Sequence, residues 1–161
     1  LADLKQPYFE DTPGTPIGLP RITFSKELAV HLGGKEVQAH YFGRGHTSGD
    51  AVIYFPELKV IHTGDLFLAS RAGGRGGAPA RERPAGVPVY IDYVQGGSFL
   101  DWSRTMDEML TLDFETVIPG HGPVSTRADV MKFRADLETM RTRLAGLIKS
   151  GRTKAELAKI L

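Results

Sequence analysis

The sequence contains no cysteine among its 161 residues. This absence excludes a disulfide framework, a thiolate zinc cluster and a cysteine nucleophile, so any metal bound here must be held by histidine and carboxylate side chains. It leaves the compartment open, because a chain without cysteine suits the cytoplasm and the periplasm equally.

Long apolar runs and an excess of one charge are lacking too. No stretch approaches the roughly 20 apolar residues that span a bilayer, and residues 1–10 lack the basic start and apolar core of a signal peptide. Lysine and arginine number 20 against 19 aspartate and glutamate residues, a net charge of +1. We therefore expect a soluble chain with neither nucleic acid nor a membrane as its partner. The first residue is Leu1 rather than methionine, which we interpret as processing or as a fragment of a longer protein.

The composition suffices for one globular domain, because 41% of the residues are apolar and 24% are charged. The first 20 residues hold four prolines, a density that breaks both helices and sheet ladders. We therefore expect an extended lead-in over residues 1–20 and one α/β domain over residues 21–161.

The spacing of apolar residues predicts a series of strands interrupted and followed by helices. Two-residue alternation between glycine and proline turns predicts strands at residues 22–25, 28–32, 35–42, 51–55, 58–62 and 114–118. The apolar run at 51–55 further predicts a strand covered on both faces. Three- and four-residue spacing predicts helices at 98–112, 126–150 and after Thr153, with the tryptophan and methionines of the first helix in the core.

A stretch rich in glycine and arginine occupies residues 69–89 and contains Arg71 and Arg75. It is too polar and too flexible to form core. A surface loop and a substrate-binding loop both fit this composition, and the two are compatible because loops carry function on rigid scaffolds. Tyr93, shortly beyond it, either lines a substrate pocket or packs against a strand.

Three side chains with metal-binding chemistry follow predicted strands. His46 and His121 lie in loops flanked by glycine, and Asp65 follows the strand at 58–62. Rigid strands would fix these ligands while glycine leaves room for a metal and its water, whose pKa a divalent metal lowers towards 7. Imidazole and carboxylate suit zinc, iron or manganese, and the spacing alone does not force the three side chains together.

Three segments that contain these residues resemble, in order and spacing, consecutive motifs of the metallo-β-lactamase superfamily. They read GHTSGD at residues 45–50, HTGD at 62–65 and VIPGHGP at 117–123. The resemblance, which covers about residues 22–161, implies the C-terminal half of an αββα sandwich, with a mixed or antiparallel sheet covered by helices on one face. It implies a site for two zinc ions, with His46 on the first metal, Asp65 as the bridging, catalytic carboxylate and His121 on the second.

The aspartate at the bridging position makes the chain similar to hydroxyacylglutathione hydrolases, lactonases and phosphodiesterases, rather than to zinc β-lactamases with cysteine there. The resemblance thus implies an enzyme that hydrolyses a small ester, thioester, lactone or phosphodiester by metal-bound hydroxide. Two alternatives stay open: a non-catalytic half-domain that serves as a binding or assembly module, and a β-lactam hydrolase in the full-length protein.

The histidine-rich signature of this family, His-x-His-x-Asp-His, is absent, because no two histidines stand two residues apart. The chain as given therefore lacks part of the ligand set and, by the resemblance, one half of the sandwich. A lone half would leave an apolar sheet face in water, so we expect the missing N-terminal half or a second copy as its partner.

Three further residues near the motifs allow two interpretations each. Asp50, with Thr47, either orients the His46 loop or caps that loop locally. His62 either packs or hydrogen-bonds near the site, which we favour, or serves as a further ligand.

Overall fold

The computed structural model describes residues 21–69 and 90–160, without the side chains of residues 158–160. The predicted lead-in at residues 1–20 and the predicted substrate-loop residues Arg71 and Arg75 lie outside the described residues. Six strands form one mixed sheet in the order β1-β2-β3-β4-β5-β6. Their bounds are Glu27–Leu32 (β1), Lys35–His40 (β2), Val52–Phe55 (β3), Val60–Leu68 (β4), Thr116–His121 (β5) and Ser125–Thr126 (β6).

The pairing of the strands follows from the length of their connections. Successive strands from β1 to β4 pair antiparallel, as do β5 and β6, whereas β4 and β5 pair parallel across a long connection that contains a helix. The β1–β2 hairpin turns at Gly33 and Gly34, whose φ angles of 59° and 76° suit a two-residue turn that only glycine adopts easily.

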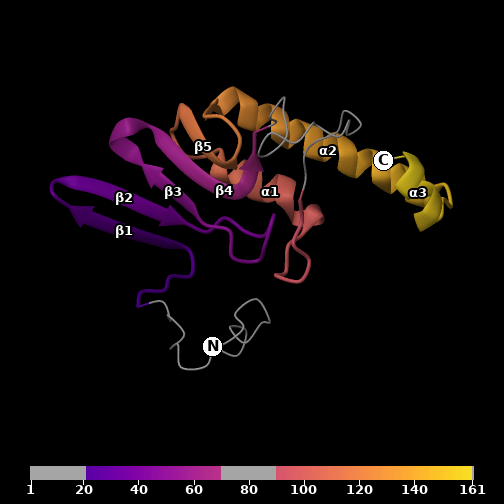
Figure 1. Ribbon diagram of the computed structural model, residues 1–161, viewed down its shortest axis with the longest axis horizontal. Helices are drawn as coiled ribbons and strands as arrows, with labels where there is room; N and C mark the ends of the chain where they lie inside the picture. The colour runs from indigo at the N-terminus through magenta and orange to yellow at the C-terminus, as the bar shows by residue number, and fades with distance from the viewer. Residues whose placement is uncertain (1–20, 70–89, 161) are drawn as a thin grey trace, which may run out of the picture.

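Two helices cover one face of the sheet, and Figure 1 shows them side by side against β3, β4 and β5. Helix α1 spans Phe99–Met109, and the hydroxyl of Ser98 caps it by accepting from the backbone N–H of Asp101. Helix α2 spans Arg127–Lys149 and extends past the sheet to the short helix α3, Lys154–Ile160. The predicted helices and their one-sided placement on a mixed sheet are confirmed.

The core lies between these helices and the sheet. It contains the predicted tryptophan and methionine residues of α1, which are fully buried, together with Phe133 of α2 in edge contact with the indole ring. Strands β3, β4 and β5 contribute alternate residues to this core. Its fully buried members include Val52, Ile61, Trp102, Met106, Met109, Val117 and Val130.

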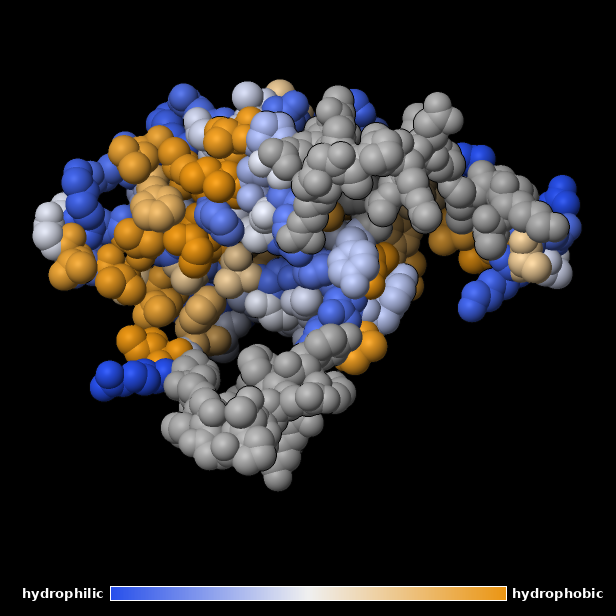
Figure 2. Space-filling view, viewed as in Figure 1, coloured by the Kyte–Doolittle hydropathy of each residue, from blue (hydrophilic) through white to orange (hydrophobic). Residues whose placement is uncertain are grey.

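The opposite face of the sheet carries apolar side chains that nothing in the described chain covers. Alternate residues of β1 point there, and Val30 and Leu32 are 47% and 80% exposed. Strand pairing places Ile53 of β3 and Ile118 of β5 on the same face. Figure 2 shows apolar side chains gathered over the part of the molecule that contains β1 to β4.

The structure corrects several predicted boundaries. Residues 22–25 form no strand, and residues 56–58 form a 3-10 turn rather than a simple reversal. The prediction that 51–55 is covered on both faces is wrong for the described part of the chain, because only alternate residues of β3 are buried. Both β4 and β5 run further than predicted, so Asp65 and His121 lie within strands. No helix of the described residues has the length and apolar character needed to cross a bilayer.

Candidate metal site

Three distant parts of the chain bring the predicted ligands together beside the adjacent strands β4 and β5. His46 comes from the loop after β2, Asp65 from the middle of β4 and His121 from the end of β5. The Nε2 atom of His46 lies 3.5 Å from one carboxylate oxygen of Asp65, and the Nε2 atom of His121 lies 3.4 Å from the other. The Asp65 carboxylate therefore stands between two imidazole rings and offers a different oxygen to each.

A glycine bulge directs Asp65 into this position. Gly64 has a φ of 51°, and the parallel register of β4 with β5 shifts on both sides of it. Gly120 on β5 leaves the space that the carboxylate fills, because a Cβ atom there would lie 2.1 Å from the Oδ1 atom of Asp65 and 2.6 Å from the carbonyl carbon of Gly64. This placement of the Asp65 carboxylate therefore requires glycine at residues 64 and 120.

The His46 loop is tied to α1 by contacts that the sequence did not predict. The guanidinium of Arg44 donates to Asp101, with an Nη2–Oδ2 distance of 2.6 Å, and the hydroxyl of Thr105 donates to the carbonyl of Arg44 at 2.8 Å. The pKa of Asp101 is held below its usual range, first by the Ser98 hydroxyl and then by Arg44. The sequence signal for this tie was an arginine between two glycines, directly before the GHTSGD motif.

Asp50 and Thr47 bond to each other. The carboxylate of Asp50 accepts from the backbone N–H of Thr47 at 3.0 Å and from its hydroxyl at 2.7 Å. The same hydroxyl accepts from the N–H of Gly49. These bonds favour the interpretation that the pair caps the His46 loop.

The structure does not bring His62 or Tyr93 into the cluster. His62 is exposed, and its Nδ1 atom accepts from the backbone N–H of Gly64 at 3.2 Å. Tyr93 is 69% exposed and lies in the loop before α1. This contact is local and joins His62 to the backbone of Gly64 rather than to a candidate ligand, so the role of His62 stays a prediction.

The spacing of these three donors is compatible with two metal positions, each of them incomplete. Two donors about 2.0–2.1 Å from one tetrahedral zinc lie roughly 3.3–3.4 Å apart, close to both nitrogen–oxygen distances here. Each candidate position therefore has one imidazole and one carboxylate oxygen. Across residues 21–69 and 90–160, no three histidine, aspartate or glutamate side chains converge on a single metal position. A metal at either position would need further ligands from outside the described side chains.

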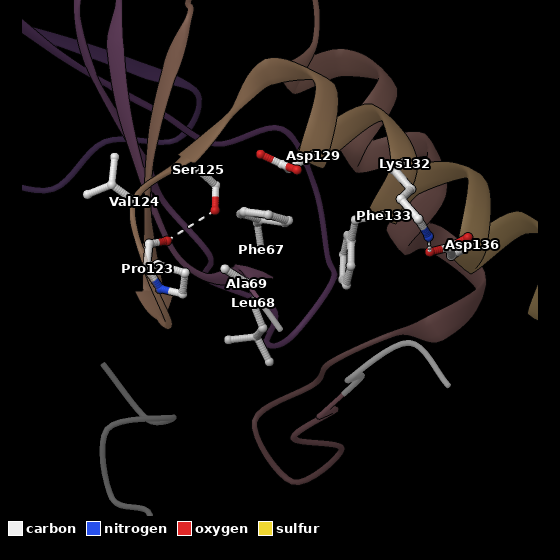
Figure 3. Close-up of a pocket in the computed structure, with 10 residues that line it drawn as sticks. All are labelled: Phe67, Leu68, Ala69, Pro123, Val124, Ser125, Asp129, Lys132, Phe133 and Asp136. Carbon is white, nitrogen blue, oxygen red and sulfur yellow. Dashed lines mark hydrogen bonds and ion pairs between the residues drawn. The ribbon is translucent and has the colours of Figure 1, made fainter. Parts of the chain in front are cut away.

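A pocket of about 330 Å³ opens on the helix-covered side of the sheet, between the end of β4 and the first turns of α2. Figure 3 shows the rings of Phe67 and Phe133 edge to face in its lining, with Lys132 paired with Asp136 beside them. None of the three candidate ligands lines this pocket. It is therefore separate from the candidate metal site.

The sequence model of the metallo-β-lactamase superfamily matches residues 2–121, about three quarters of the chain. This chain belongs to that superfamily. The match ends at His121, so α2 and α3 follow the part of the chain that the superfamily model covers.

Two curated members of the superfamily are similar to the chain, both named metallo-β-lactamase type 2. The protein of Bacillus sp. (strain 170) is 24% identical over 100 residues, which cover 61% of this chain and 33% of the relative. The protein of Bacteroides fragilis is 23% identical over 111 residues, 68% of this chain and 37% of the relative. The chain therefore spans about a third of the length of these curated relatives.

Solved structures of the superfamily share the fold. A metallo-β-lactamase from Pontibacter korlensis superposes with a TM-score of 0.57 at 20% identity and covers 75% of this chain and 50% of its own. The DIM-1 metallo-β-lactamase gives a TM-score of 0.52 at 22% identity, over 72% of this chain and 47% of its own. These proteins thus contain about as much chain again as the part that is shared.

Proposed function

We propose that this chain is part of a metal-dependent hydrolase that acts on an ester, thioester, lactone or phosphodiester. The observation that carries the proposal is the Asp65 carboxylate, which lies between two imidazoles at distances suited to two shared metals. Membership of the superfamily supports hydrolase chemistry in general, and the finer choice of substrate rests on the identity of residue 65.

Zinc is the metal that we propose for this site, with iron or manganese as alternatives of similar ligand preference. When bound, such a metal supplies a Lewis acid and a water that ionises near neutral pH. In this chain His46 and His121 would each hold one metal, and Asp65 would hold both. The side chain of His46 is 13% exposed and that of His121 is 50% exposed, so His121 is the more open of the two imidazoles.

A β-lactam hydrolase is the second candidate, and the names of the two curated relatives favour it. Residue 65 argues against it. By the resemblance given above, zinc β-lactamases have cysteine at this position, and the chain contains no cysteine. A carboxylate can offer a separate oxygen to each of two metals, as Asp65 does here towards the two imidazoles, so the donor at residue 65 differs in kind from that of the cysteine-bearing enzymes. We therefore rank the ester and phosphodiester class first.

We also propose that the uncovered sheet face meets a second αβ unit. Val30, Leu32 and Ile118 are exposed on one continuous face, and the superposed structures contain about as much chain again. The N-terminal half of the same protein would both cover this face and complete the ligand set, whereas a second copy of this chain would only cover the face. A half-domain with neither would act as a binding module, which is the non-catalytic alternative.

The proposal is tested by substituting Asp65 in the full-length protein. Asp65→Asn removes the charge and one strong donor while it keeps the shape, so zinc content should fall by at least one ion per chain and ester hydrolysis by at least a hundredfold. His31→Gln is the matched control, because His31 is exposed on β1 and far along the sheet from β4. Hydrolysis and zinc content that survive Asp65→Asn unchanged would overturn the proposal.

If the unsubstituted protein hydrolyses a β-lactam faster than an ester, the result would instead favour the second candidate. A protein that is free of metal and inactive on all four substrate classes would favour the binding module.

A further inference from the structure

The segment at residues 90–97, which connects to the first turn of α1, lies directly against the His46 loop. Three hydrogen bonds join the two stretches, and all of them use the backbone of the 90–97 segment. They run from the N–H of Asp92 to the carbonyl of His46 (2.9 Å), from the N–H of Ser48 to the carbonyl of Gln95 (2.9 Å), and between His46 Nδ1 and the carbonyl of Tyr90 (2.7 Å).

The contact with Tyr90 determines which nitrogen of His46 carries the proton. A carbonyl oxygen only accepts hydrogen bonds, so at 2.7 Å the Nδ1 atom of His46 must donate. In a neutral imidazole this leaves the lone pair on Nε2, the atom that faces the Asp65 carboxylate. The backbone of Tyr90 thus presents His46 in the tautomer that a metal on Nε2 needs.

Gly97 allows the segment to approach this closely. A Cβ atom at residue 97 would stand 2.2 Å from the carbonyl oxygen of His46 and 2.9 Å from that of Asp92. Both atoms belong to backbone and cannot move aside as the end of a flexible side chain would. The N–H of Gly97 also donates to the carbonyl of Asp92 at 2.8 Å, which closes the segment on itself.

We propose that the 90–97 segment is a positioning element for His46, with the Tyr90 carbonyl fixing the tautomer and Gly97 permitting the contact. This inference rests on the proposed function, since it gives the segment a role in loading metal at His46. The ring of Tyr90 lies 5.4 Å from the imidazole of His46 and adds packing to the same side chain. None of these residues contributes a donor to the metal itself.

The first test needs no substitution. Long-range ¹⁵N–¹H spectra of the metal-free 161-residue chain at a pH where its histidines are neutral should show His46 as the Nδ1–H tautomer, with an Nε2 shift typical of an unprotonated nitrogen. Finding the Nε2–H tautomer at His46 overturns the proposal, whatever the protein does with metal.

The second test compares two glycine-to-alanine variants in the full-length protein, titrated with zinc alone. Gly97→Ala should give a mixture of His46 tautomers and weaken zinc binding by about 10- to 100-fold, the range found when a partner of a metal-bound histidine is lost. Gly146→Ala is the control, because a Cβ atom there meets nothing within 4 Å, and it should leave both readouts unchanged.

The possible outcomes separate this inference from the proposed function. If Gly97→Ala keeps both the wild-type tautomer of His46 and the wild-type affinity for zinc, the positioning role is overturned. The hydrolase proposal then still stands. An unsubstituted full-length protein that binds no zinc defeats the hydrolase proposal, while the tautomer still reports on the Tyr90 contact. If Gly97→Ala does not fold, the tautomer of the unsubstituted chain decides.

Discussion

On the sheet face covered by α1 and α2, Val52 and Ile61 are fully buried, whereas Ile53 and Val60, their neighbours in the same two strands, remain partly exposed on the other face. Both faces are apolar, so hydrophobicity does not distinguish them. The difference lies in what covers them, since the described chain brings two helices to one face and nothing to the other. The candidate site lies beside the interior strands β4 and β5, which supply Asp65 and His121.

The covered face should carry most of the stability of this chain, and Trp102→Ala gives the largest expected effect. The indole of Trp102 is fully buried, and its Nε1–H donates to the carbonyl of Leu66 at 2.9 Å. Its removal leaves a cavity and an unpaired carbonyl, so the free energy of unfolding should fall by about 3–5 kcal/mol. Urea unfolding followed by circular dichroism measures this loss.

Leu100→Ala serves as the control for that variant, because Leu100 lies on the same helix and is 74% exposed. It should change the free energy of unfolding by less than about 0.5 kcal/mol. Equal losses in the two variants would mean that α1 does not pack on the sheet as described.

The start of α2 offers a medium-sized effect on the same face. Thr126 and Asp129 form a capping box, and hydrogen bonds from the hydroxyl and the backbone N–H of Thr126 hold the pKa of Asp129 below its ordinary value of 3.8. A lowered folded-state pKa means that this stabilisation is complete above about pH 4 and is lost as the pH falls through the folded-state pKa. Thr126→Ala should cost about 1 kcal/mol at pH 7.

The measurement is urea unfolding of the wild type and Thr126→Ala from pH 7 down to pH 2. The difference between the two should shrink as the pH falls below about 4, because protonated Asp129 no longer accepts the same hydrogen bonds. A difference that stays constant to pH 2 would show that the cap acts without the charge of Asp129.

The sequence predicted the covered face well because its pattern is local and periodic. The helix predicted from residue 126 to Gly151 matches α2, because its cap and its apolar spacing both depend on residues that are close together in the sequence. The predicted end of β4 at His62 was wrong, because Gly64 and Asp65 interrupt the alternation. Parallel pairing with β5 continues the strand past them, and such pairing depends on backbone rather than on side-chain pattern.

The same distinction applies to the candidate site. Proximity of His46, Asp65 and His121 was predicted by a resemblance of motifs, not by their spacing, which spans 76 positions from residue 46 to residue 121. The 90–97 segment was not predicted to touch His46, because its three contacts are made by backbone atoms that leave no trace in residue type. Their role in binding metal stays a prediction.

A substitution on the uncovered face should have the smallest effect on unfolding. It also tests most directly whether the two faces of the sheet differ in what covers them. Leu32 is 80% exposed at the end of β1, so Leu32→Ser should change the free energy of unfolding of the isolated chain by less than about 0.5 kcal/mol. If this face is built to meet a second αβ unit, the same substitution should weaken that association, because it replaces apolar area at the contact. Sedimentation of the chain alone, and with the separately produced N-terminal part, measures the two associations. Loss of stability without loss of association would mean that Leu32 supports its own hairpin and that the partner lies elsewhere.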